Sequence, residues 1–435
     1  MVLWIMPQLS LFETTIESLK IPVADNSSTF QENLALPVHR WFRYSAGFSA
    51  RWVRELISAQ LSKGASRILD PFAGSATVLL EAQFAGACSI GIEAHPLVAR
   101  IARTKLLWDS KDSDFKLFAE RVLDRASNCS VAERCEPPLL QKCYPAEILI
   151  RLRALHETLV NLSDGSASSE LSWLALISIL RQCSPVGTAQ WQYVLPSKKK
   201  AKVLDPFRAF HLKVCQMTED MRVRQSLPSG PRPIIYQEDA RQCPSVASGW
   251  AQLVITSPPY ANNYDYADST RLEMTFLGEI RSWGDLQDAV RKHLIRSCSQ
   301  HVSRISSQTT ELISDSLLAP IRNELTIACS KLEEEREHHG GKKTYHTMVA
   351  AYFKDMARVF DTLRRITAAG ALACFVIGDS APYGVHIPVD RWLGELAISS
   401  GFRSYRFEKT RERNIKWKNR KHRVPLHEGR LWIEG

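Results

Sequence analysis

The sequence predicts an α/β fold whose open sheet is interrupted by two helical insertions. Residues 67–84 read as a short apolar strand, a glycine loop and a helix, and residues 88–93 as a second strand that ends in Glu93. A third apolar strand, residues 253–255, stops at two consecutive prolines. Open α/β sheets bind ligands at the carboxyl ends of their strands, so these three strand ends are the expected site.

Composition narrows the class of protein. The chain has 435 residues, enough for one large domain with insertions or for two or three domains, and its 45% hydrophobic content suits a globular core. A net charge of +10 suggests a polyanionic partner, although many soluble enzymes are also basic. The ten cysteines contain no C-x-x-C pair, so we expect free thiols and a cytoplasmic protein. We expect no signal peptide, and the longest apolar run, near residues 171–180, is too short to span a bilayer.

The amino-terminal part leads into the first strand. Residues 1–36 form a leader of weak periodicity, and residues 37–49 are dense in aromatic and basic side chains and are interpreted as a loop. A helix is expected at residues 50–61. The order strand, glycine loop, helix, strand and acid is that of nucleotide-type sites, in which loop amides approach the ligand and the acid binds ribose hydroxyls. An acid at a strand end can instead cap a helix.

Two regions interrupt the α/β alternation. Residues 108–230 carry helical patterns and a lysine cluster, which we interpret as a solvated loop, with phosphate binding as the alternative. The alternation resumes at residues 234–240, a strand that ends in an acidic pair including Asp239, and a second helical region follows. Helices at 345–366 and 388–399 and strands at 371–377 and 402–407 complete the core, before a basic tail that suits a nucleic acid or forms an exposed end. The predicted segments are a leader at 1–36, three parts of the α/β core at 37–107, 231–266 and 344–435, and two helical insertions at 108–230 and 267–343.

The loop after the third strand is the candidate catalytic element. Proline fixes φ and lacks an N–H, so Pro258 and Pro259 must carry the chain away from the sheet in a rigid, extended form. The loop would then present the Ser257 hydroxyl, a backbone carbonyl and the ring of Tyr260 at the strand end. A proline turn without function would have the same sequence.

Together these segments resemble the S-adenosylmethionine-dependent amino-methyltransferases of DNA. The resemblance is carried by the Asp-Pro-Phe-Ala-Gly-Ser loop that starts at Asp70, by Glu93, by Asp239 and by the Thr-Ser-Pro-Pro-Tyr loop that ends at Tyr260. It implies a Rossmann-like class I methyltransferase sheet and covers the α/β core but neither insertion. The Ser-Pro-Pro-Tyr form is typical of cytosine-N4 enzymes, whereas adenine-N6 enzymes usually have Asp at position 257.

The resemblance also implies the role of each site residue. Ser257, Pro258, Pro259 and Tyr260 would be catalytic: the Ser257 hydroxyl and the Pro258 carbonyl would accept the two N–H bonds of the target amine, and Tyr260 would stack on a flipped base. The residues expected to bind S-adenosylmethionine are Tyr44, Phe48, Asp70, Phe72, Ala73, Gly74, Ser75, Thr77, Glu93 and Asp239. No metal is required. Ala76 departs from the family, which usually has a second glycine there, and alanine is tolerable if its φ is negative.

The function expected from these residues is transfer of a methyl group to cytosine N4 in a specific sequence of double-stranded DNA, with a cognate restriction nuclease as a further partner. Three alternatives stay open: adenine-N6 methylation of DNA, guanine-N2 methylation of RNA, and a DNA-binding protein that keeps the fold without catalysis. Either insertion could read the DNA sequence. The oligomeric state does not follow from the sequence.

Overall fold

The structure is a computed structural model, and it describes residues 30–44, 48–129, 134–188, 193–200, 202–340, 343–413 and 424–435. Most of the predicted leader lies outside these residues, as do residues 45–47 of the aromatic loop and residues 414–423 of the basic tail. Within the described residues, no helix combines the length and apolar character needed to cross a membrane.

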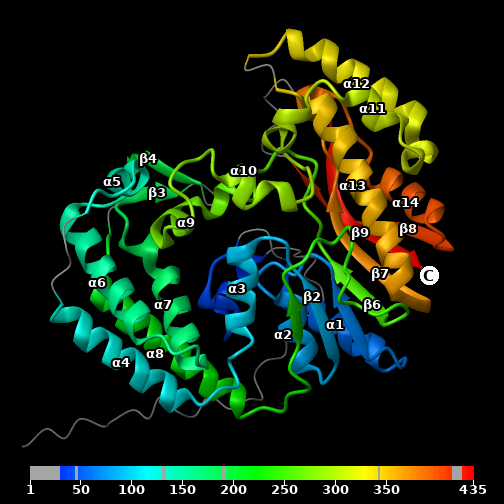
Figure 1. Ribbon diagram of the computed structural model, residues 1–435. Coiled ribbons are helices and arrows are strands. Elements are labelled where there is room, and N and C mark those ends of the chain that lie inside the picture. Colours follow the sequence, from blue (N-terminus) through cyan, green and yellow to red (C-terminus); the bar gives the residue numbers. More distant parts are fainter. Residues whose placement is uncertain are drawn as a thin grey trace, which may run out of the picture.

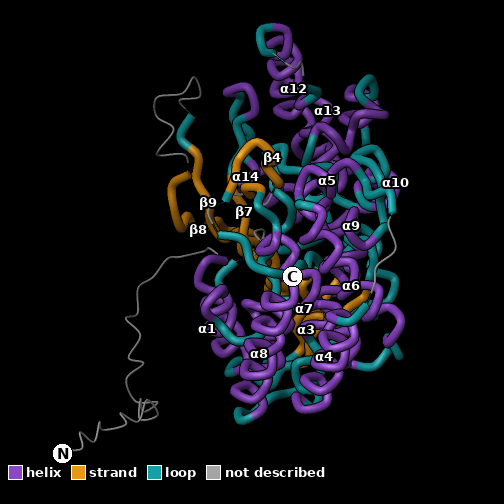
Figure 2. The backbone as a smooth tube through the Cα atoms, turned by 90° about the vertical axis from the view of Figure 1, so that its left-hand side faces the viewer, coloured by secondary structure: helices purple, strands orange, loops and turns teal. Residues whose placement is uncertain are grey.

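A seven-stranded sheet in the order β5-β2-β1-β6-β7-β9-β8 forms the centre of the molecule (Figure 1). The strands from β5 to β7 are parallel, while β9 is antiparallel to β7 and β8. Figure 2 shows β8 and β9 at one edge. The strand bounds are β1 Arg67–Asp70, β2 Cys88–Ile92, β5 Ile234–Tyr236, β6 Ala251–Thr256, β7 Thr367–Gly378, β8 Ser404–Arg413 and β9 Leu426–Glu434.

Two hydrophobic cores lie on the two faces of this sheet. Side chains alternate along a strand, so Ile255 packs in one core and its neighbour Val254 in the other. The first core joins the sheet to α1, α2, α3 and the first insertion, and the second joins it to α13 and α14. The helices of the α/β core are α1 Ala50–Leu61, α2 Thr77–Phe84, α3 Pro96–Lys105, α13 Tyr345–Ile366 and α14 Val389–Ser399.

The first helical insertion lies on one side of the α/β core, and the second runs from the first insertion to α13 (Figure 1). The first contains α4 Asp112–Ser127, α5 Pro138–Cys143, α6 Ala146–Leu162, α7 Ala167–Cys183 and α8 Pro206–Gln225, with a hairpin of β3 Val186–Thr188 and β4 Val194–Lys199. The second contains α9 Arg271–Leu277, α10 Leu286–Ala289, α11 Thr309–Ser314 and α12 Arg322–Glu337, with short 3-10 helices at Asp268–Thr270, Arg291–His293, Ser299–Ile305 and Ser316–Ile321. These elements confirm the predicted α/β class with two helical insertions.

Three local predictions need correction. Lys198 and Lys199 are exposed to solvent as predicted, but they lie in β4 rather than in a loop, and the ammonium of Lys200 donates a hydrogen bond to the carbonyl of Arg181 at 2.6 Å. The aromatic loop contains a short 3-10 helix, His39–Trp41. The last predicted strand extends to Arg413, because it pairs along its length with β9, a strand that the sequence did not reveal.

Candidate cofactor and catalytic site

A pocket lies at the carboxyl ends of β1, β2 and β6, where the sequence placed the site. Its empty volume is about 820 Å³, including space open to solvent. Of the predicted residues, those that line it are Tyr44, Phe48, Asp70, Phe72, Ala73, Gly74, Ser75, Thr77, Glu93, Asp239, Ser257 and Pro259. Pro258 and Tyr260 are not in its lining; Pro258 is buried and Tyr260 is partly exposed.

The loop between β1 and α2 is fixed by the carboxylate of Asp70. One oxygen, Oδ1, accepts hydrogen bonds from the Phe72 amide at 3.0 Å and from the Thr256 hydroxyl at 2.7 Å, and so joins the loop to the end of β6. Burial raises the pKa of Asp70 to about 7. Gly74 has a φ of +50°, and a Cβ there would lie 3.2 Å from the ring of Tyr44. Only glycine suits this close contact between the loop and the aromatic segment.

Ala76 has a φ of 69° and a ψ of 32°, the left-handed conformation. Alanine would be unstrained at this position only with a negative φ. Its φ is positive, so the backbone of Ala76 is strained. Its amide still donates to the carbonyl of Ala73 at 2.8 Å, which closes the loop just before α2. The strain lies in the loop that lines the pocket.

The carboxylate of Glu93 bridges the end of β2 and the glycine loop. Oε2 accepts the amide of Gly74 and Oε1 accepts the amide of His95, each at 2.8 Å. An ionised carboxylate has about four acceptor positions, so Glu93 keeps room for the hydroxyls of a ligand. Burial raises the pKa of Glu93 to about 7. Its role as a loop support is additional to the predicted contact with ribose.

Asp239 lines the pocket but is already paired within the protein. Its carboxylate accepts hydrogen bonds from the guanidinium of Arg241, at 2.5 Å for Nη2, and from the Arg241 amide at 2.9 Å. Arg241 also lies 3.1 Å from Asp355. The position of Asp239 at the end of the pocket is therefore set by an ionic network, which the sequence motif did not reveal.

The hydroxyl of Ser257 donates a hydrogen bond to the carbonyl of Val376 on the neighbouring strand β7, at 3.1 Å. Because its single proton is used in this way, the lone pairs of the oxygen can accept N–H groups from the pocket side. Tyr260 follows the two prolines, but its phenol lies within hydrogen-bonding reach of the Ser257 side chain, and the guanidinium of Arg413 lies 5.3 Å from the centroid of its ring. Burial raises the pKa of Tyr260, so its phenol stays neutral.

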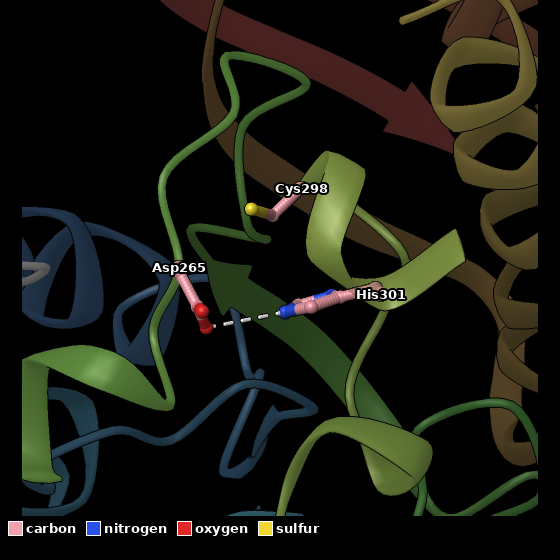
Figure 3. A group of neighbouring side chains, drawn as sticks. All are labelled: Asp265, Cys298 and His301. Carbon is pink, nitrogen blue, oxygen red and sulfur yellow. Dashed lines mark hydrogen bonds and ion pairs between the residues drawn. The ribbon is translucent and has the colours of Figure 1, made fainter. Parts of the chain in front are cut away.

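The second insertion holds the Ser-Pro-Pro-Tyr loop from outside. Asp265, just after this loop, accepts two hydrogen bonds from the buried guanidinium of Arg291, at 3.0 and 2.7 Å. Figure 3 shows Asp265 facing His301, with Cys298 beside them. The ligand atoms of these three side chains lie within 4.8 Å of one another, as in a metal site. Since the Arg291 cation already neutralises Asp265, we assign the group to support of the loop.

Several residues that line the pocket were not predicted. His95 is buried, its Nε2 pairs with the Thr270 hydroxyl at 2.8 Å, and burial lowers its pKa to about 4. Other lining residues come from the second insertion, namely His293, Leu294 and Ile295. The sequence offered no signal for this insertion segment, because it reaches the pocket through tertiary packing and carries no motif.

The sheet, the glycine loop with its acid and the Ser-Pro-Pro-Tyr loop are consistent with a Rossmann-like methyltransferase fold. Comparison with curated proteins agrees: the chain is 26% identical to the Type II methyltransferase M.BsoBI of Geobacillus stearothermophilus, over 92% of this chain and 88% of that protein. It is 25% identical to the Type II methyltransferase M.AvaI of Nostoc sp., over 86% of this chain and 81% of that protein. These similarities confirm the resemblance to methyltransferases. No family model and no solved structure matches the chain.

Proposed function

We propose that this protein is a sequence-specific DNA methyltransferase that uses S-adenosylmethionine to methylate the exocyclic N4 of cytosine. The amine of cytosine is a weak nucleophile, because its lone pair is delocalised into the ring. A catalyst for this reaction must hold the amine in line with the methyl group and favour a tetrahedral nitrogen.

The observation that carries the proposal is the hydrogen bond from Ser257 to Val376, at 3.1 Å. This bond leaves the hydroxyl oxygen as an acceptor within the pocket. An exocyclic amine has two N–H bonds, and the Ser257 oxygen and the Pro258 carbonyl would accept one each. The lone pair of the amine nitrogen would then point toward the methyl group. Catalysis would rest on orientation and electrostatics.

The prolines and Tyr260 complete this arrangement. Pro258 and Pro259 restrict the backbone, so the two acceptors stay at a fixed separation. Tyr260 would stack on the base, which has to leave the duplex to reach the pocket. Arg413 occupies one side of the Tyr260 ring, and we expect the base on the other side.

The pocket residues fit S-adenosylmethionine. The buried hydroxyl of Ser75 has no hydrogen-bond partner among the described residues, so it is available to a polar ligand group. The amides of Phe72, Ala73 and Gly74 already donate within the protein, so the Ser75 hydroxyl would hold the methionine part. Glu93 would bind the ribose hydroxyls and Asp239 the adenine amine. When bound, S-adenosylmethionine would supply a methyl group already activated by its sulfonium, so the protein need only position the amine.

The relatives support DNA as the substrate, since their printed names describe Type II methyltransferases and the Ser-Pro-Pro-Tyr loop resembles that of enzymes acting on DNA. The net charge of +10 suits a duplex. A restriction nuclease of the same specificity would be the natural partner of such an enzyme, and the reaction would take place in the cytoplasm.

Nucleoside mass spectrometry tests the proposal. DNA would be analysed from cells that express the wild type, Ser257→Ala, or Ser303→Ala, which removes an exposed hydroxyl in the second insertion. We expect N4-methylcytosine with the wild type and Ser303→Ala but not with Ser257→Ala. N6-methyladenine instead would overturn the choice of base, and no modified base with the wild type would contradict DNA methylation altogether.

A further inference from the structure

A segment of the second insertion closes one side of the pocket. We call His293, Leu294 and Ile295 the insertion wall; all three line the pocket. Leu294 is 8% exposed and packs in one hydrophobic core, while Ile295 is 3% exposed and packs in the other. The wall is therefore anchored to both cores of the protein.

The insertion wall stands at the Asp239 end of the pocket. The Nη2 of Arg241, whose guanidinium pairs with Asp239, lies 3.4 Å from the carbonyl oxygen of His293 and donates to it. Tyr44 contacts the glycine loop at Gly74, at a different part of the lining. A ligand that places its adenine at Asp239 would meet the wall with that ring.

A chain of ionic contacts connects the wall to Asp239. Directly after the wall, Arg296 donates to the carboxylate of Asp355 on α13 through Nε at 2.8 Å and Nη2 at 2.6 Å. Arg241 contacts the same carboxylate at 3.1 Å and also holds Asp239. The Asp355 side chain is fully buried. Burial alone would raise its pKa, but the hydrogen bond and charge of Arg296 and the charge of Arg241 outweigh burial and lower it, so the carboxylate stays ionised.

We propose that the insertion wall forms the adenine-side surface of the cofactor pocket and that Arg241, Asp355 and Arg296 are positioning residues for it. This inference rests on the proposed function, because it takes S-adenosylmethionine as the ligand. A flat, largely apolar purine ring requires an apolar surface as well as a polar acceptor. Leu294 and Ile295 supply the surface and Asp239 the acceptor. Arg241 fixes the relative position of the two, because it contacts both Asp239 and the wall.

The same segment also touches the catalytic loop, since the amide of Asn263 donates to the carbonyl of Ser297 at 3.1 Å. A change at Arg296 could therefore lower activity without any effect on cofactor binding. Equilibrium binding separates the two possibilities, because it requires no turnover. Adenosine is the sharper probe, because it has no methionine part and reports only on the adenine end and the ribose.

The experiment is isothermal titration calorimetry of the purified full chain with S-adenosylmethionine and with adenosine. Arg296→Gln removes the cation that holds the wall, and Arg296→Lys keeps the charge but loses the paired geometry. Arg304→Gln is the matched control, because Arg304 lies in the same insertion in an exposed ion pair with Asp288. We expect Arg296→Gln to weaken both ligands about tenfold, equivalent to about 1.4 kcal/mol. Arg296→Lys should recover part of the loss, and Arg304→Gln should bind like the wild type.

Hydrogen exchange on the wild type gives a second readout that does not depend on a variant folding. Amides of residues 291–297 should exchange more slowly once S-adenosylmethionine is bound, while those of α12 in the same insertion should not change. Suppose that the wild type binds S-adenosylmethionine. If Arg296→Gln then binds it equally well, or if the amides of residues 291–297 gain no protection, this inference is overturned but the proposed function is not. A wild type that binds neither ligand would overturn the proposed function, and this inference with it.

Discussion

The carboxylate of Glu93 accepts the amide of Gly74 at 2.8 Å, although the two residues lie 19 positions apart. The bond joins the end of β2 to the turn of the glycine loop. The other oxygen of the Glu93 carboxylate accepts the His95 amide, so the carboxylate is held on both sides and cannot rotate freely. One side chain thus supports the loop and faces the pocket. This double use gives Glu93 a pH dependence that can be measured.

Affinity for S-adenosylmethionine should rise with pH through about 7. Burial raises the pKa of Glu93 to about 7, so its carboxylate is largely ionised only above that pH, and only this form accepts both amides and ligand hydroxyls. The free energy of unfolding without ligand changes in the opposite direction. Between about pH 4.5 and 7 the folded state keeps a proton on Glu93 that the unfolded state has released, so stability falls as the pH rises through this range. The raised pKa of Asp70 also makes the stability of the folded state fall as the pH rises.

Glu93→Gln should weaken binding about tenfold to a hundredfold at pH 8, the usual loss for a hydrogen bond to a charged group. It should also flatten the pH dependence of binding between pH 6 and 8. Calorimetric titrations at several pH values measure both effects. A variant whose affinity still rises steeply over this range would show that another group controls the titration.

Asp265→Asn should destabilise the protein and slow methyl transfer. Burial raises the pKa of Asp265, but hydrogen bonds from His301 and Arg291 outweigh it and hold the pKa at about 2. The variant leaves the buried Arg291 cation without its carboxylate, and breaking such a pair costs about 3–5 kcal/mol. Thermal unfolding and single-turnover rates measure the two effects. Asp288→Asn, which breaks an exposed pair with Arg304, should change neither. If Asp265→Asn unfolds at the same temperature as the wild type, the pair of Asp265 and Arg291 does not support the loop.

The sequence predicted the parts of the site that are local. The strand, the glycine loop and Glu93 follow one another along the chain, and a motif of adjacent residues describes them. The φ of Ala76 could not be predicted, because the surrounding packing imposes it. The strand at Lys198 and Lys199 was missed because its partner, β3, has only three residues. The insertion wall was missed because its position depends on Asp355, which is 59 residues from Arg296 in the chain.

Ala76→Gly should be tolerated, in contrast to the same change in the next helix. A left-handed alanine carries strain of about 1 kcal/mol or more, which glycine relieves, although glycine also makes the unfolded chain more flexible. The two effects nearly cancel. Ala82 is equally buried but lies within α2, where glycine costs about 1 kcal/mol with no compensating relief. Thermal unfolding should therefore rank Ala82→Gly clearly below Ala76→Gly. Equal losses would show that position 76 stores no strain.

Tyr260→Ala should weaken binding of DNA whose target base is mismatched, and Tyr260→Phe should not. A mismatched base can leave the helix at little cost, so the affinity of the protein for mismatched DNA reports directly on stacking of the flipped base. Loss of an aromatic platform costs about 1–3 kcal/mol per base. Arg413 lies over one face of the ring and fixes its orientation, and phenylalanine keeps this contact. Fluorescence anisotropy with mismatched duplexes measures the affinities, and S-adenosylmethionine binding should be unchanged, because Tyr260 does not line the pocket. Wild-type DNA affinity in Tyr260→Ala would place the flipped base away from this ring.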